Sequence, residues 1–436
     1  MNRRIASALV VIGLALGLSA VAAVAVGRTP ARPDAAQPAP AAGRADPLGR
    51  EIAVLQDRLR RSPEDYQAWA SLGLDYVQQA KLTVDPSYYP KATEALDRSL
   101  TLNGTENFQA MAGQSALKSG EHDFTAALGW AQRGLTINPY NATLYGALND
   151  AQTQLGMYDE AARSAQRMNE LKPGTPAFTR SEYVFELHGE IAAATTAMRR
   201  ALDDATSPAD RAFAHYYLGE LAFNAGDPAA ALAENEAGLA IDPTYSALRQ
   251  GKARAEAALG RTDAAVADYL KVVSEVPQPQ YVVEAGELLQ SLGRDREAQQ
   301  QFTVFGTEVA LFQANGVTLD TDPTLFYADH GDPAKALAFG EAGLRIRPFI
   351  EMEDAYAWAL HANGRDAEAQ AHMAKAMALG TRNALFFFHR GMIEKSLGQR
   401  AAAKASLEQA QAINPHFSLY HAPMLRQALT ELGGAA

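Results

Sequence analysis

Histidine and carboxylate side chains are the groups of this sequence that could do chemistry. Six of the nine histidines lie in the last quarter of the chain, among them His330, His361, His389, His416 and His421. Grouped histidines are typical of metal sites and of acid–base chemistry. One hypothesis is therefore an accessory protein of the cell envelope that handles a metal or a glycan with this histidine-rich C-terminal end.

Other signals of catalysis are missing from the sequence. It has no cysteine, which excludes disulfides, thiolate nucleophiles and cysteine-based zinc sites. It also lacks a His-Glu-x-x-His motif, a phosphate-binding glycine loop, a nucleophile elbow and carboxylates at ligand spacing. We therefore predict no enzymatic activity, no cofactor, no catalytic residue and no metal ligand.

The functional side chains must be positioned by a sequence repeat of about 34 residues. The phrase GDPAAALAENEAGLAIDP (226–243) returns as GDPAKALAFGEAGLRIRP (331–348). A glycine followed five residues later by alanine recurs at 156/161, 189/194, 226/231, 260/265, 293/298, 331/336, 364/369 and 398/403. Prolines at 139, 173, 243, 277, 348 and 415 keep the same register.

Each repeat unit has the pattern of two helices. In the unit from Pro208 to Pro243, apolar residues at helical spacing end at Gly226, where a C-cap glycine would stand. A second amphipathic stretch follows and Pro243 closes it. No strand-like alternation of useful length occurs. The sequence therefore predicts an all-α solenoid of helix pairs.

Three segments resemble the tetratricopeptide repeat family. They are HYYLGELAFNAGDPAAALAENEAGLAIDP (215–243), FHRGMIEKSLGQRAAAKASLEQAQAINP (388–415) and AWASLGLDYV (68–77), the last with Trp69, Leu72, Gly73 and Tyr76. Other phrases are similar to exported or membrane-anchored bacterial members of unassigned function. The resemblance implies a right-handed superhelix of nine to ten helix–turn–helix units over residues 51–415, closed by a capping helix and tail at 416–436.

The same resemblance implies that ligands lie on the concave face, which the first helix of each unit lines. Positions i, i+4 and i+7 of these helices share one face. The predicted partner-binding residues are Tyr183, Glu186, Tyr216, Glu220, Phe223, Arg254, Glu287, Asp354, Trp358, His361 and Phe388. Aromatic anchors beside charges are typical of a peptide groove. Tyr216, Phe223 and Trp358 are the residues that we most expect to contact a ligand.

Net charge narrows the class of partner. The chain carries a formal charge of −11, although its first 50 residues hold six arginines and only two aspartates. The repeat body is thus more acidic than the whole. An acidic body argues against nucleic acid as the partner and favours neutral or basic peptides.

The N-terminus predicts the location. Arg3 and Arg4 precede twenty-three uncharged residues, Ile5–Gly27, enough to cross a bilayer. We interpret residues 1–27 as an uncleaved bacterial membrane anchor with the repeats outside the cytoplasm. A signal peptide, cleaved after Ala-x-Ala at 20–22 or 23–25 to give a secreted or periplasmic protein, is the alternative. Residues 28–50 are predicted to be a disordered, Pro/Ala-rich linker.

Together these features predict a non-catalytic scaffold on the extracytoplasmic side of a bacterial membrane. Its partner would be a peptide or protein held in the concave groove, and Ile5–Gly27 would contact the membrane if uncleaved. The alternative is the metal- or glycan-handling protein introduced above. The sequence specifies neither the ligand nor the oligomeric state.

Overall fold

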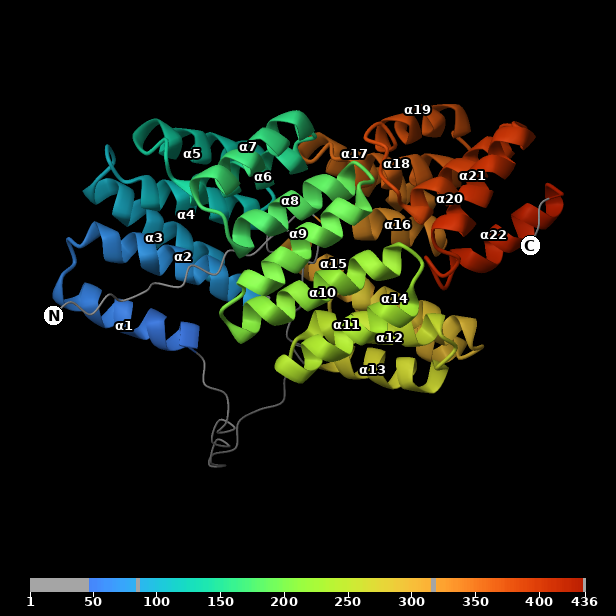
Figure 1. The fold of residues 1–436 in the computed structure, drawn as a ribbon, viewed down its shortest axis with the longest axis horizontal. Helices are drawn as coiled ribbons and strands as arrows, with labels where there is room; N and C mark the ends of the chain where they lie inside the picture. The colour runs from blue at the N-terminus through green and yellow to red at the C-terminus, as the bar shows by residue number, and fades with distance from the viewer. Residues whose placement is uncertain (1–46, 84–86, 315–318, 434–436) are drawn as a thin grey trace, which may run out of the picture.

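A computed structural model describes residues 47–83, 87–314 and 319–433, and every regular element in these ranges is an α-helix (Figure 1). The predicted all-α fold is confirmed. The helices are α1 (Pro47–Arg61), α2 (Tyr66–Thr83), α3 (Tyr88–Leu102), α4 (Phe108–Gly120), α5 (Phe124–Ile137), α6 (Ala142–Gln154), α7 (Tyr158–Leu171), α8 (Thr175–Leu187), α9 (Ile191–Asp204), α10 (Pro208–Asn224), α11 (Pro228–Ile241), α12 (Ser246–Ala258), α13 (Thr262–Glu275), α14 (Pro279–Ser291), α15 (Asp295–Ala314), α16 (Thr321–Asp329), α17 (Pro333–Ile346), α18 (Ile350–Ala362), α19 (Asp366–Ala376), α20 (Ala384–Ser396), α21 (Arg400–Ile413) and α22 (His421–Glu431).

Within the described ranges, α2 to α21 form successive antiparallel pairs, from α2–α3 to α20–α21, with α1 and α22 covering the two ends. The turn between α10 and α11 shows why each pair forms. Asp227 caps α11 by accepting the N–H of Ala230, and Pro228 occupies the first turn, where its missing N–H costs nothing. Asp332 and Pro333 repeat this arrangement before α17.

The first helix of each pair is more enclosed than the second. Ten of the thirteen residues of α18 are buried, whereas only three of the eleven residues of its partner α19 are buried. A first helix packs against its own partner and, in most units, against the first helix of a neighbouring unit. Polar residues on first helices must therefore either find partners inside the protein or face the axis of the superhelix.

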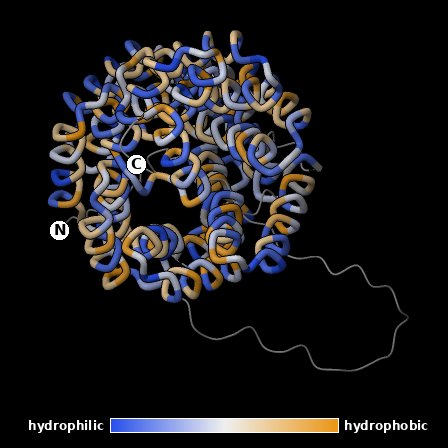
Figure 2. Tube along the Cα trace, turned by 90° about the vertical axis from the view of Figure 1, so that its right-hand side faces the viewer, coloured by the Kyte–Doolittle hydropathy of each residue, from blue (hydrophilic) through white to orange (hydrophobic). Residues whose placement is uncertain are grey.

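The solenoid winds around a closed ring when it is viewed along its long axis (Figure 2), and successive turns of the superhelix touch. The Tyr158 hydroxyl accepts the backbone N–H of Ile350 at 2.7 Å, and the Asn414 amide donates to the Phe223 carbonyl at 2.7 Å. The Thr381 hydroxyl donates to the Leu187 carbonyl. These pairs are separated by 191 to 194 positions, which corresponds to between five and six units per turn. The C-terminal helices therefore lie alongside α6–α10 (Figure 1).

Close approach between turns depends on the absence of side chains at three inter-helix turns. A Cβ atom at Gly189 would lie 2.6 Å from the carbonyl oxygen of Gly380 in the next turn. Gly156 and Gly226 meet the carbonyls of Pro348 and Ile413 in the same way, at 2.7 and 2.6 Å. By contrast, a Cβ at Gly364 would meet no heavy atom within 4 Å. The recurring glycine thus follows the end of a helix in eight units, and at Gly156, Gly189 and Gly226 the missing side chain also lets the next turn of the superhelix approach.

Two sequence expectations fall outside or at the edge of the described residues. The predicted anchor, Ile5–Gly27, and most of the predicted linker lie outside them, and no helix within the described ranges is long and apolar enough to cross a membrane. The first described helix, α1, begins at Pro47, inside the range predicted to be linker.

We expect Gly189→Ala to destabilise the fold more than Gly364→Ala. Both residues have a left-handed φ, 73° and 70°, so both substitutions carry a similar backbone cost of about 1 kcal/mol. Only the Gly189 variant also forces a methyl group against the next turn. Urea unfolding measures the free energy of each variant, and small-angle X-ray scattering should show a lengthened particle only for Gly189→Ala. Equal losses of stability would contradict the inter-turn contact.

Candidate functional site

A cavity of about 510 Å³ lies on the inner face of the superhelix. First helices α10, α12, α14 and α16 contribute one wall, and residues 415–426 from the next turn contribute the other. Its apolar lining includes the aromatic rings of Phe223, Phe326 and Phe417. This volume falls within the usual range for ligand pockets, which are mostly apolar with a few convergent polar groups.

Glu284 on α14 is one of those polar groups, and neutral donors hold it in place. Its Oε2 accepts the Gln250 amide and, at 2.9 Å, the buried Tyr269 hydroxyl. Its Oε1 accepts the Gln280 amide at 2.9 Å. Three directional hydrogen bonds fix the position of this carboxylate without placing a cation on it.

Asp322, in the first turn of α16, is the second carboxylate that lines the cavity without a cation bonded to it. Burial and the nearby Asp320 raise the pKa of Asp322 to about 6, and Glu284 acts in the same direction. Among the described residues its side chain makes no hydrogen bond or ion pair. Its negative charge is therefore poorly compensated by the protein itself.

The two arginines near these carboxylates are already paired. Arg254 forms an ion pair with Glu220, and its guanidinium lies 4.2 Å from the centre of the Phe223 ring. Arg347 pairs with Asp320 at 3.0 Å, and both side chains are buried. Neither Glu220 nor Asp320 lines the cavity. With these two arginines engaged, Arg426 is the other arginine of the lining and could balance one of Glu284 and Asp322, so one negative charge remains in excess.

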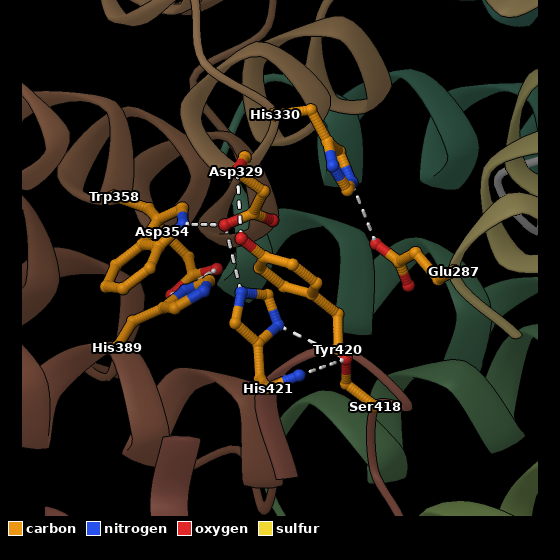
Figure 3. A network of polar contacts seen from close by, with 9 residues as sticks. All are labelled: Glu287, Asp329, His330, Asp354, Trp358, His389, Ser418, Tyr420 and His421. Atoms are coloured by element: carbon orange, nitrogen blue, oxygen red, sulfur yellow. Dashed lines mark hydrogen bonds and ion pairs between the residues drawn. The ribbon is translucent and has the colours of Figure 1, made fainter. Parts of the chain in front are cut away.

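A polar network joins the C-terminal segment to α16 at the end of the cavity (Figure 3). The buried Asp329 carboxylate accepts the Trp358 indole N–H at 2.7 Å and lies 3.0 Å from His421 Nε2. Tyr420 donates its hydroxyl to the backbone carbonyl of Asp329 at 3.0 Å. Burial disfavours the charged form of both groups, but their attraction and hydrogen bond outweigh it. The pKa of Asp329 is therefore lowered and that of His421 is raised. The His421–Asp329 contact thus fixes the C-terminal segment to α16.

Ser418, His421 and Asp329 are connected in the order of a Ser-His-Asp triad, but their geometry indicates a structural role. Ser418 Oγ lies 3.2 Å from His421 Nδ1 and also accepts the backbone N–H of His421 at 3.1 Å, as an N-cap serine does. Asp329 raises the pKa of His421, which disfavours the neutral imidazole that would be needed to remove a proton from Ser418.

The prediction that Asp354, Trp358 and Phe388 lie on an open groove is wrong. Their exposed fractions are 1%, 5% and 0%. Trp358 and Phe388 belong to a hydrophobic cluster that α22 covers, and Asp354 pairs with the fully buried His389 at 3.0 Å. The reason is the position of these residues near the end of the solenoid, where the capping helix folds over the face that the repeat pattern leaves open.

Other predicted groove residues do reach the inner face. Phe223, Arg254 and Glu287 line the cavity, and Glu287 pairs with His330 at 3.3 Å. Glu220 is engaged by Arg254. Ligand contact by these four predicted residues stays a prediction.

The remaining predicted residues have partners within the protein. Tyr183 donates its hydroxyl to Glu351 of the next turn at 3.0 Å, and Glu186 lies 3.5 Å from the Asn224 amide. Burial raises the pKa of Glu186 to about 7. The Tyr216 ring packs edge-on against Tyr217, with centroids 5.0 Å apart. His361 pairs with Asp366 at 2.5 Å.

Five of the six histidines of the C-terminal end lie against a carboxylate, each against a different one. The pairs are His330–Glu287, His361–Asp366, His372–Glu353, His389–Asp354 and His421–Asp329. In the part of the chain that the structure describes, no group of three or more histidine, aspartate or glutamate side chains has an arrangement that could hold a metal ion. No geometric observation therefore favours the metal-handling hypothesis.

Sequence reasoning missed Glu284, Asp322 and Asp329, which line the cavity. Asp329 and His421 are 92 positions apart, about half a turn of the superhelix. The repeat register assigns faces within a unit, but it carries no signal for which residues of successive turns meet.

We expect Trp358→Ala to lower the free energy of unfolding by about 3–5 kcal/mol, because it leaves a cavity in a packed cluster and removes the hydrogen bond to Asp329. Tyr140→Ala is the matched control, since Tyr140 is 72% exposed and its loss should cost little. Denaturant unfolding of both variants measures the difference. A Trp358 variant as stable as the Tyr140 variant would return Trp358 to the candidate ligand-binding residues.

Comparison with known proteins identifies one unit directly. The family model described as Tetratricopeptide repeat matches residues 384–417, which contain α20 and α21. No curated protein matches the chain.

Several solved structures are similar in fold. A thermophilic tetratricopeptide repeat protein from Thermus thermophilus is 22% identical, with 44% of this chain and 98% of that chain covered and a TM-score of 0.38. A tetratricopeptide repeat protein from Parabacteroides merdae is 17% identical, with 60% and 99% covered and a TM-score of 0.35. Yeast Tom70 is 13% identical, with 88% and 93% covered and a TM-score of 0.39. The chain thus contains a tetratricopeptide repeat at residues 384–417, and the resemblance to this repeat family is confirmed.

Proposed function

We propose that this protein is a non-catalytic scaffold that binds a peptide segment of a partner protein on the inner face of its superhelix. The observation that carries the proposal is the cavity of about 510 Å³ between two successive turns. One of its walls belongs mainly to the first helices of four units, the helices that the repeat architecture turns toward the axis. A tetratricopeptide repeat fold supports an interaction scaffold in general, and the cavity supports this particular place.

The composition of the cavity wall suits a peptide. Phe223, Phe326 and Phe417 offer apolar surface on which side chains can anchor, and Glu284 and Asp322 offer hydrogen-bond acceptors beside them. Buried aromatic anchors with a small number of fixed polar groups give both affinity and orientation. A peptide brings both kinds of group on one flexible chain.

The proposal places the repeats outside the cytoplasm of a bacterial cell. Two arginines followed by twenty-three uncharged residues, Ile5–Gly27, support a membrane-inserting segment. An uncleaved anchor would hold the scaffold at the membrane surface, whereas cleavage would release it into the periplasm or the medium. Either form exposes the cavity to extracytoplasmic partners.

Filling the cavity should abolish peptide binding. Ala257 lines it, so Ala257→Trp introduces an indole into the space that a peptide side chain would occupy. The test is selection from a phage-displayed library of random peptides on the full chain in detergent. Peptides selected on the parent are expected to bind the Ala257→Trp variant at least ten-fold more weakly. Ala229→Trp, on the exposed face of α11, controls for the added indole. Equal binding to both variants, or no selected peptide at all, would overturn the proposed function.

The location makes a separate prediction. Protease added to intact spheroplasts of a bacterial host that expresses the full chain should digest the repeats, because only the residues before Ile5 stay in the cytoplasm. Immunoblotting of the membrane fraction before and after lysis measures this. Repeats that become sensitive only after lysis would show that the body is cytoplasmic.

A further inference from the structure

We propose that the cavity selects a cationic side chain, an arginine or lysine of the bound peptide, which lies between Glu284 and Asp322. This inference rests on the proposed function and specifies the chemistry of its ligand. It goes beyond the acidity of the whole chain, because it assigns the selectivity to two carboxylates of one cavity.

The first step is the charge balance around the cavity. Glu284 is held by two amides and a tyrosine hydroxyl, none of which carries a charge. Asp322 has no hydrogen-bonding partner among the described residues. Both carboxylates line the same cavity, and the charge of Glu284 contributes to the raised pKa of Asp322. A ligand cation between them would remove this repulsion and neutralise two half-buried carboxylates.

The second step is that the resident cations cannot neutralise both carboxylates, because the exposed Arg426 of the lining could balance only one of them and the two other arginines nearby are engaged. Arg254 interacts electrostatically with Glu284, but its guanidinium is bonded to Glu220 and lies over the Phe223 ring. Arg347 is bonded to Asp320. A move of either arginine into the cavity would leave its present carboxylate partner buried and unpaired, which is strongly unfavourable.

The third step is the shape of the remaining space. The hydrocarbon stem of an arginine or lysine is apolar, and its charged head needs several acceptors. Phe223, Phe326 and Phe417 provide apolar and aromatic surface on the same cavity wall as Glu284 and Asp322. The volume of about 510 Å³ leaves room for one such side chain and part of the backbone that carries it.

A bare metal ion fits these groups less well. A metal site needs several carboxylate oxygens that are free to coordinate, whereas Glu284 already accepts three hydrogen bonds. The planar guanidinium of arginine instead offers five N–H donors, enough to reach a free lone pair of Glu284 and the Asp322 carboxylate together. An anionic peptide group would meet an excess of negative charge and is excluded.

The experiment begins with peptides selected on the full chain from a random phage-displayed library. We expect one peptide position to be enriched in arginine or lysine. The best arginine peptide is then synthesised with arginine and with citrulline, its neutral isostere, or a lysine peptide with lysine and acetyl-lysine. Fluorescence anisotropy should give a dissociation constant at least ten-fold weaker for the neutral peptide.

Variants connect this preference to the two carboxylates. With Glu284→Gln plus Asp322→Asn, the charged and neutral peptides are expected to bind within two-fold of one another. The control is Glu190→Gln plus Asp263→Asn, which removes the same charge from positions outside the cavity and should keep the ten-fold preference. A preference that survives loss of Glu284 and Asp322, or that disappears in the control, overturns the inference.

The two proposals can fail separately. Selected peptides without a basic preference that still lose binding to Ala257→Trp would overturn the cation site and leave the scaffold function intact. Selection of no peptide would overturn both. Misfolding is checked by the melting temperature at pH 7.5. Because the folded state raises the pKa of Asp322 to about 6, its charged form opposes folding above that pH, and Asp322→Asn alone should melt no lower than the parent.

Discussion

Contact between successive turns of the superhelix determines whether the inner face of this protein is an open channel or a cavity. The Tyr158–Ile350, Leu187–Thr381 and Phe223–Asn414 hydrogen bonds set the pitch, since each joins units about one full turn apart. With a wider pitch, the first helices would face an open channel. At this pitch, residues 415–426 of one turn lie against α10–α16 of the turn before and enclose a cavity. The cavity therefore exists because of the short pitch of the superhelix.

The enclosed inner face explains the unusual carboxyl groups of the structure. Burial raises the pKa of Asp322 to about 6 and that of Glu186 to about 7. A carboxyl group whose pKa is higher in the folded than in the unfolded state stabilises the fold only while protonated, below its ordinary pKa. These groups therefore cost stability as the pH rises from about 4 toward 7. A fold selected for stability alone would replace them with apolar residues of similar volume.

The sequence predicted what is local and missed what joins distant turns. Glycines at a 34-residue spacing predicted the helix pairs, because a helix stop is encoded within a few residues of the stop itself. The same register placed Phe223, Arg254 and Glu287 on the inner face, where the structure has them. It failed for Trp358 and Asp354, because the residues that cover them come from α22 and α20 and not from their own unit. Pitch is the sum of small rotations over several units, and no short motif encodes it.

The C-terminal segment shows why capping and binding are coupled in this molecule. A solenoid needs only an apolar cover over its last unit, and Leu425 and Leu429 on α22 provide one. Residues 414–423 do more than this, since Asn414 bonds to Phe223 of the preceding turn and His421 to Asp329. Phe223 and Asp329 also line the cavity. Any ligand that fills the cavity must therefore contact a wall that the cap itself holds in place, so binding and the docking of the C-terminal segment must stabilise one another.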